Sequence, residues 1–394
     1  MDKGFIHACV IQFLLGLSWS TINILLVIYA ATFDSPTLFG TLWSIIGLAR
    51  FLAETPGGIL VDRIGRRIVV LGGLTSVAIS FIRFATAQTA LDVLVASALA
   101  GAGFAVTHIG VMVQAADHIP PEERVRYMGL FNGSMMASNI VGPVIGGFVA
   151  KYFYLRASFI ASTLAASAAL LISILTIRDH QRSEGQVKEE GSSMLQDYRV
   201  FIRNRLYLIL FLVSFCFALI VWSFGAMVFP NYGRNILSLT IAEIGLLTSI
   251  NSIILFLNQF FLSGIMERRL SRRALISLGL LIYGAAAYSF SILSDFYSLA
   301  IAFIVLGMGL GTLSPSLEAI WIDITKTEER GRIFGLRIAF FDFGQVLFSV
   351  VMPIIMSLDS RLPFYAIALG ALSIAVLMHL TFRGTRQTTE SIGH

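Results

Sequence analysis

Ionisable side chains inside apolar stretches are the residues of this chain best suited to chemistry. Asp342 lies in the run 340–343, which also holds three phenylalanines, and Glu318 follows the Ser-Pro-Ser run 314–316, where a proline interrupts helical hydrogen bonding. Apolar surroundings penalise the charged form of a carboxylate, so such a group can load and release a proton. Protonation also removes a buried charge and eases helix movement. Asp342 is the first candidate for proton exchange, and Glu318 is the second.

Further charged residues lie in apolar stretches. Arg50 and Glu54 are four residues apart, so they share a helix face and predict an ion pair; the alternative is that both face a cavity, with Glu54 a third proton-exchange candidate. A static salt bridge with Arg337 or another buried arginine is the alternative role of Asp342. Because five residues on a helix turn through roughly 140°, Arg337 is a poor partner within one helix.

The elements that must position these side chains are membrane helices. The chain is 56% hydrophobic and 13% charged, whereas soluble proteins carry about a quarter charged residues. Apolar stretches of about 20 residues recur, each long enough to cross a hydrocarbon core of roughly 30 Å. We predict an all-α membrane protein of twelve spans, near residues 5–33, 37–61, 68–87, 91–117, 126–150, 154–177, 206–232, 239–265, 274–293, 296–322, 331–356 and 362–382.

Lysine and arginine positions predict the orientation. With the amino terminus inside, 21 of the 28 lysines and arginines fall in inside segments, four in outside loops and three within spans. We therefore expect a multi-pass protein of the cell membrane with both termini in the cytoplasm. The net charge of +5 then reflects contact with lipid headgroups rather than nucleic acid. Zinc-ligand spacings, phosphate loops and nucleophile elbows are absent from the sequence, so we expect no metal, no cofactor and no enzyme activity.

The chain contains an internal repeat. Gly58–Arg67 and Gly264–Arg273 match at five of ten positions, 206 residues apart, and the same offset superposes Gly101–Leu130 on Gly307–Leu336. Because both pairs of segments match at the same offset, the sequence predicts two copies of a six-helix half, 1–177 and 206–394. A polar cytoplasmic linker, 178–205, joins them. Two such halves are the architecture of a secondary transporter.

The segment Gly58–Arg67 closely resembles the signature loop of the major facilitator superfamily, since an acidic residue, two glycines and three arginines are in place. The resemblance covers the whole chain and implies two six-helix halves around a cavity that works by alternating access. It assigns gate roles to the loop and its surroundings, at Gly58, Asp62, Arg63, Gly65, Arg66, Arg67, Asp117, Arg268, Arg269, Arg272 and Asp323. Asp62 is expected at the amino end of span eleven, and Arg66 beside Asp117, in contacts that hold the halves together.

A second motif in span five resembles the Gly-Pro-x-x-Gly-Gly signature of the antiporter and drug-efflux branches. Its residues are Gly142, Pro143, Gly146 and Gly147, which suit helix bending and close helix contact. The alternative is a packing site shared by transporters of either direction. Ser97 stands where many drug-efflux members carry an arginine in span four, so a role for that arginine does not carry over.

Polar and aromatic residues inside the spans are candidates for a substrate cavity. They are Trp19, Asn23, Arg50, His108, Asn132, Asn139, Asn251, Asn258 and Arg337. Few charges and many phenylalanines favour small hydrophobic or amphipathic cargo, so we predict proton-coupled export of such compounds. The alternatives are an uptake or facilitative carrier of a small metabolite, or a lipid translocase. One chain already holds both halves of a cavity, so we expect the monomer to function.

Overall fold

The described residues form twelve helical rods. The computed structural model describes residues 2–33, 38–119, 124–177, 205–267, 269–325 and 330–383. The helices are α1 (Lys3–Ala30), α2 (Leu38–Ile64), α3 (Arg66–Thr86), α4 (Ala90–Ala116), α5 (Arg124–Tyr152), α6 (Leu155–Thr176), α8 (Arg205–Phe217), α9 (Phe229–Asn235), α10 (Ile241–Leu257), α11 (Ser263–Glu267), α12 (Arg272–Ser289), α13 (Phe296–Ile324), α14 (Arg330–Leu358) and α15 (Leu362–Arg383).

Two rods contain π-helical turns. Ala218–Trp222 and Phe224–Val228 join α8 to α9, and Asn258–Leu262 joins α10 to α11. Nine helices of the described ranges are long and apolar enough to cross a membrane by length and composition alone. The other three rods are α2, which carries four charged residues and a proline, the interrupted α8–α9 rod, and α12, which begins with two arginines.

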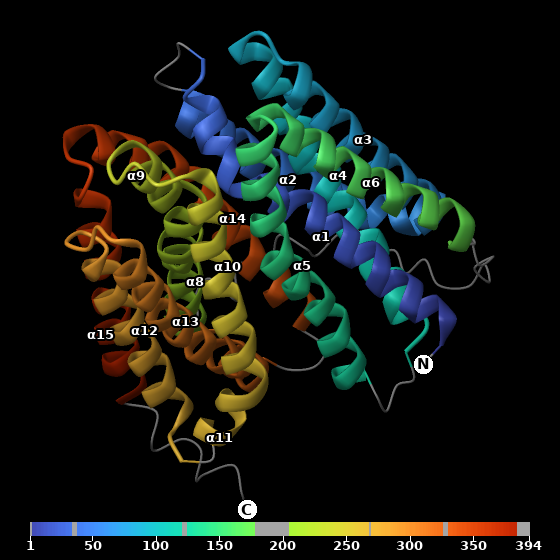
Figure 1. Cartoon of the computed structure of the whole chain (residues 1–394). Coiled ribbons are helices and arrows are strands. Elements are labelled where there is room, and N and C mark those ends of the chain that lie inside the picture. The colour runs from blue at the N-terminus through green and yellow to red at the C-terminus, as the bar shows by residue number, and fades with distance from the viewer. Residues whose placement is uncertain are drawn as a thin grey trace, which may run out of the picture.

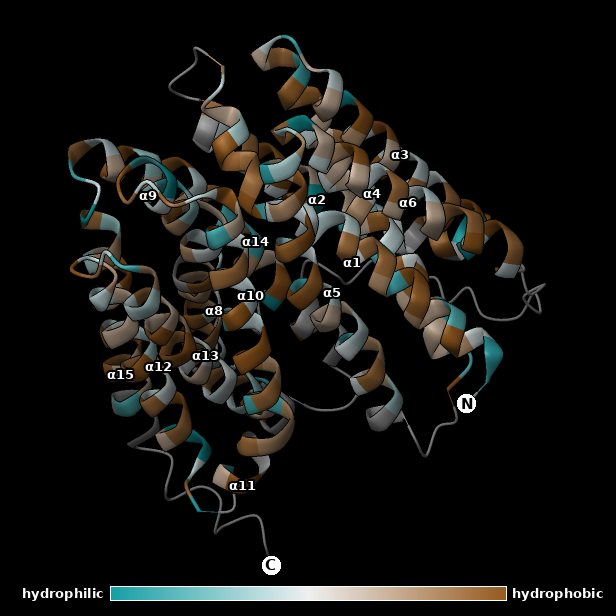
Figure 2. Ribbon diagram, viewed as in Figure 1, coloured by the Kyte–Doolittle hydropathy of each residue, from teal (hydrophilic) through white to brown (hydrophobic). Residues whose placement is uncertain are grey.

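The rods form two bundles. Helices α1–α6 pack around one apolar core, which includes Phe81 and Phe159, and α8–α15 around another, which includes Phe303 and Trp321. The bundles lie side by side and diverge toward the end of the molecule where α1 begins and α15 ends (Figure 1). Hydrophobic residues predominate along the described helices, as a lipid environment requires (Figure 2).

The sequence repeat reappears as a repeated helix contact. A Cβ on Gly103 would lie 2.8 Å from the carbonyl oxygen of Gly73, and a Cβ on Gly309 would lie 2.9 Å from that of Gly279. Gly279 and Gly309 stand 206 residues after Gly73 and Gly103. Both halves therefore use paired glycines to bring α3 onto α4 and α12 onto α13, which is how small residues support helix packing in lipid.

Two helix pairs make the main contacts between the halves, and α1 adds smaller contacts with α9 and the π-helical segment before it. Helix α5 packs on α10, and α2 packs on α14. We call these contacts the α5–α10 seam and the α2–α14 seam. Gly147 meets Ile241 and Ala242 in the first, while Gly40 meets Pro353 and Gly47 meets Val346 in the second. These positions lie toward the carboxyl end of α5 and the amino end of α2, so the halves close at the end away from the termini (Figure 1).

Candidate functional site

A cavity of about 480 Å³ lies between the halves. It is lined from α1, α2, α4, α5, α10, α12, α13 and the π-helical segment after α8. Six of the residues predicted for a cavity line it: Trp19, Asn23, Arg50, His108, Asn139 and Asn251. We call this space the central cavity.

Three predicted cavity residues need correction. Asn132 is not among the described residues that line the central cavity. Asn258 instead holds helices together, since its side-chain amide donates to the Met308 carbonyl at 2.8 Å and to the Thr312 hydroxyl at 3.1 Å. Arg337 lines a second space, described below. A polar residue in a span satisfies its hydrogen bonds wherever a partner lies, and that position depends on helix rotation.

The walls of the central cavity are aromatic with isolated polar atoms. Trp19 contacts Phe104, and Trp222 continues the aromatic surface toward the other half. The side-chain oxygens of Asn23 and Asn251 and the indole nitrogen of Trp222 are buried without a hydrogen-bond partner in the structure. These atoms belong to residues that line the cavity, and a few polar groups in a mostly apolar pocket are the usual way to orient a bound organic molecule.

A second space of about 310 Å³ adjoins the first and carries most of the charge. Arg50 and His108 line both spaces, so they mark the boundary. The second space is also lined by Glu54, Glu318, Arg337 and Asp342. We call it the charged chamber.

At this boundary Arg50 lies between two carboxylates. Its Nη2 atom is 3.7 Å from Glu54 on the same helix, as the spacing predicts, and 4.0 Å from the Asp342 carboxylate on α14. The carboxyl groups of Glu54 and Asp342 also interact directly. The Asp342 side chain is fully buried. Sequence reasoning did not find the contact between Arg50 and Asp342, although it allowed for a buried arginine as partner. We call these three residues the charge cluster.

The other two charges of the chamber neutralise each other. Arg337 on α14 donates to Glu318 on α13 at 2.5 Å, and the Glu318 side chain is 48% exposed. This contact explains why Arg337 is not the partner of Asp342. It also places Glu318 in a static, partly solvated pair within the carboxyl-terminal half.

His108 and Phe104 support Arg50 from α4. The Arg50 guanidinium lies 5.5 Å from the centre of the Phe104 ring, and that ring stacks on His108. His108 Nδ1 lies 2.9 Å from the Gln12 side-chain nitrogen on α1. A cation over an aromatic face is stabilised, so the amino-terminal half holds Arg50 in place.

The loop between α2 and α3 is organised by a turn at Gly65. Its φ of 89° lies in the left-handed region that only glycine adopts readily. Arg66 then forms an ion pair with Asp117 at the end of α4, as expected. Both residues belong to the amino-terminal half, so this pair does not itself join the halves, contrary to the role expected for it.

The other described residues that were predicted for the gate contact their own half or are exposed. Arg67 donates to the Ile174 carbonyl at 3.5 Å, and Arg272 pairs with Glu267 at 2.5 Å. Arg63 and Arg269 are exposed, and a Cβ on Gly58 would have no neighbouring atom of the described residues within 4 Å. Four predictions lie outside the described residues: Arg268, the side chains of Asp62 and Asp323, and the linker 178–204.

The motif in α5 packs against two neighbours at once. A Cβ on Gly142 would meet Ser20, and one on Gly146 would meet the Thr21 carbonyl, both on α1. Gly147 faces α10 instead, where a Cβ would lie 2.9 Å from the Ile241 carbonyl. Pro143 lines the central cavity. The motif therefore packs α5 against α1, contributes to the wall of the central cavity and forms part of the α5–α10 seam.

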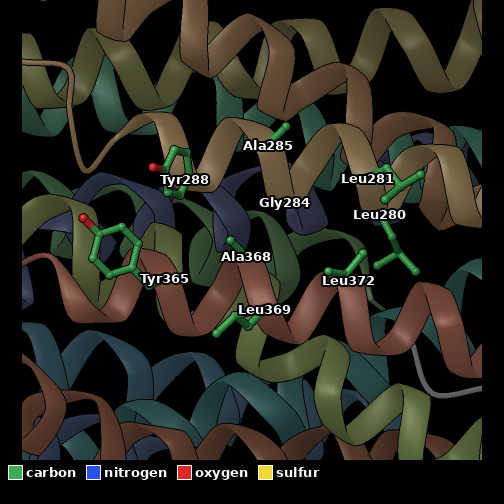
Figure 3. A pocket seen from close by; sticks show the side chains of 9 residues that line it. All are labelled: Leu280, Leu281, Gly284, Ala285, Tyr288, Tyr365, Ala368, Leu369 and Leu372. Atoms are coloured by element: carbon green, nitrogen blue, oxygen red, sulfur yellow. The ribbon is translucent and has the colours of Figure 1, made fainter.

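A third space lies on the outer surface of the carboxyl-terminal half. It is a groove of about 490 Å³ between α12 and α15, with Gly284 and Ala368 on its floor and Tyr288 and Tyr365 at one end (Figure 3). No charged residue of the described chain lines it. Its position and composition are those of a lipid-facing surface, so it takes no part in the site.

A polytopic bundle of two repeated halves around a central cavity defines a membrane transporter. The chain belongs to the Major Facilitator Superfamily, whose family model matches residues 8–234 and 210–393. It is therefore a transporter and not an enzyme, as predicted.

Three known proteins illustrate the relationship. Multidrug resistance protein 1 of Bacillus subtilis (strain 168) is 24% identical over 350 residues, covering 86% of this chain and 87% of the relative. Tetracycline resistance protein, class B, of Escherichia coli is 23% identical and covers 96% of this chain and 94% of the relative. The crystal structure of the nucleoside transporter NupG superposes with a TM-score of 0.81 at 14% identity, covering 96% of this chain and 100% of NupG. The likeness to NupG shows only that the two proteins share a fold.

Proposed function

We propose that the chain is a proton-coupled exporter of small hydrophobic or amphipathic organic compounds, with both termini in the cytoplasm. Relatives named for multidrug and tetracycline resistance support export of such compounds. The central cavity supports the same class of cargo, because aromatic walls accept an apolar body and isolated amides orient it.

The charge cluster is the observation that carries this proposal. One guanidinium and two carboxylates sum to one negative charge, so the cluster is neutral only when one carboxyl group holds a proton. A buried net charge is costly in low dielectric. Because Arg50 and Glu54 belong to one half and Asp342 to the other, taking up or losing that proton changes the attraction between the halves.

Alternating access follows from where the halves touch. They are closed at the α2–α14 and α5–α10 seams and diverge toward the termini. With cytoplasmic termini, this conformation faces inward and admits cargo from the cytoplasm. Opening the seams would expose the charge cluster to the outside, where a proton enters as cargo leaves.

Transport by the purified protein in liposomes tests this proposal. The vesicles carry an internal pH dye and an imposed proton gradient, and the panel contains amphipathic amines, sugars and amino acids. We expect amphipathic compounds alone to trigger proton flux. Cargo movement without proton flux would contradict the proposal and indicate a facilitative carrier.

A further inference from the structure

The π-helical segment 218–228 lies between the cores of the two halves. Phe224 packs against Phe290 at a ring-centre distance of 4.9 Å in the core of the carboxyl-terminal half. Met227 is fully buried in the core of α1–α6 instead. Segments of π-helix are rare and are frequent at functional sites. Because both halves pack against the segment, its position is fixed, and any surface that they leave uncovered is held in place.

The uncovered surface of this segment belongs to the central cavity. Of the residues in 218–228 whose burial the structure describes, only Val221, Trp222 and Gly225 are partly exposed, and all three line the central cavity. The rings of Trp222 and Trp43 meet edge to face at 5.6 Å, and Trp43 on α2 is fully buried. A buried neighbour in the other half therefore fixes the direction of the Trp222 indole.

Gly225 leaves space on the cavity side of this segment. It is the only described glycine that lines the central cavity, and a Cβ on it would have no neighbouring atom of the described residues within 4 Å. Its φ is not in the left-handed region, which among the described glycines is adopted by Gly65. Neither close helix packing, as at Gly103, nor backbone conformation therefore requires a glycine here. What the glycine provides is bare backbone beside Trp222.

On the basis of the proposed function, we infer that Trp222 and Gly225 form a subsite for a flat aromatic ring of the cargo. The ring lies over the backbone at Gly225, with the Trp222 indole beside it. A flat ring reaches van der Waals contact with a peptide plane at about 3.5–4 Å when no Cβ intervenes. Contact with an indole adds an attraction that a saturated ring lacks. Gly225 keeps the space free, and Trp222 favours aromatic over saturated rings.

Equilibrium dialysis of the purified protein in lipid nanodiscs tests this subsite. The probes are a fused-ring aromatic compound and its fully hydrogenated analogue, each carrying the same alkyl amine chain. Empty nanodiscs correct for partition of each probe into lipid. We expect the wild type to bind the aromatic probe at least about threefold more tightly, which is the order of one aromatic contact. Equal binding of both probes by the wild type would overturn the inference.

Substitutions at Gly225 test whether its open space is the subsite. Gly225→Val adds a side chain where the structure has room for one, so the protein should fold and keep its melting temperature. We expect the aromatic probe to bind at least about fivefold more weakly, and the saturated probe to change less than about twofold. Gly129→Val, also in open space but away from the cavity, is the matched control and should keep the preference. Equal weakening of both probes in Gly225→Val would indicate a hinge glycine and contradict the subsite.

Substitutions at Trp222 test the aromatic contact. Trp222→Leu should lose the preference for the aromatic probe and still bind the saturated one, because the cavity wall stays apolar. Trp222→Phe keeps an aromatic face and should retain most of the preference. An undiminished preference in Trp222→Leu would contradict the assignment of this residue.

The failure of this inference can be told apart from failure of the proposed function. Equal binding of both probes, with proton flux in liposomes for both, contradicts the subsite and leaves proton-coupled export in place. Selective binding of the aromatic probe without proton flux supports the subsite and contradicts proton-coupled export. A wild type that binds neither probe contradicts both.

Discussion

The two seams between the halves differ in one respect that matters for transport. The α5–α10 seam contains close backbone contacts, with Gly147 against Ile241 and Gly245 against the Pro143 carbonyl, and its charged residues Lys151 and Glu243 lie outside the buried part. The α2–α14 seam begins in the same way, with Gly47 against Val346, but continues toward the middle of the molecule into the charge cluster. The buried part of one seam depends on shape, whereas the other seam also carries a buried charge cluster.

This difference separates two tasks. Close glycine contacts require that the halves meet in a defined geometry, and they are insensitive to protons. The contact between Arg50 and Asp342 strengthens or weakens with the ionisation of a carboxyl group. We infer that the α5–α10 seam sets the geometry of closure, whereas the α2–α14 seam makes closure depend on a proton.

The largest loss of stability is expected when the positive charge of the α2–α14 seam, on Arg50, is removed. Arg50→Met keeps much of the side-chain volume but leaves Glu54 and Asp342 without their cation. We expect a loss of about 3–5 kcal/mol in the free energy of unfolding at neutral pH. The loss should shrink as the pH falls, because protonated carboxyl groups no longer need a partner. Thermal unfolding in detergent across pH measures it, and a loss independent of pH would contradict the charge argument.

The α5–α10 seam should respond to shape instead. In Gly147→Val the new side chain would meet Ile241 and Ala242, so we expect a loss of about 1–3 kcal/mol that does not vary with pH. Cysteine labelling should also show that the central cavity becomes easier to reach from the outer side. Gly129→Ala, in the same helix but with open space around it, is the matched control and should change neither property. Equal effects of both variants would mean that the seam does not depend on close contact.

A smaller loss of stability is expected when a neutral polar contact of the α2–α14 seam is removed. The Ser44 hydroxyl donates to the Val346 carbonyl at 3.3 Å and to the Gly40 carbonyl at 3.0 Å. Ser44→Ala should cost about 0.5–1.5 kcal/mol and leave proton coupling intact. Loss of coupling in this variant, measured as proton flux in liposomes, would show that hydrogen bonding rather than charge links the seam to the proton.

The smallest effect should come from the exposed pair in the charged chamber. Glu318→Gln removes the partner of Arg337 where solvent can replace it, so we expect about 0.2–1 kcal/mol. Coupling should persist, since the pair lies within one half. Uncoupled transport in Glu318→Gln would assign the proton to Glu318 and contradict the comparison of the two seams.

The features of the fold and site that could be predicted from the sequence are those that depend on periodicity and short-range spacing. The 206-residue repeat predicted two copies of one half, and the matching glycine contacts at Gly103 and Gly309 agree with it, because a repeated helix packing requires a small residue at the same point in each half. The four-residue spacing of Arg50 and Glu54 anticipated their pairing, because one helix turn fixes their relative direction.

Contacts between distant helices could not be predicted in this way. Arg50 and Asp342 meet because α2 and α14 face each other at a particular rotation, and nothing local in either helix specifies that rotation. The same limit misplaced Asn258 and Arg337, whose partners lie on neighbouring helices of their own half. The π-helical turns that place Trp222 at the cavity likewise have no clear local signal.

Transport by Asp342→Asn in liposomes is the most direct test of the central claim that a buried carboxyl group couples proton entry to cargo release. The assay compares proton-driven accumulation of an amphipathic amine with exchange of labelled for unlabelled amine in the absence of a gradient, with Glu318→Gln as control. We predict that Asp342→Asn retains exchange but loses proton-driven accumulation, while the control keeps both. Full proton-driven accumulation in Asp342→Asn would contradict the account.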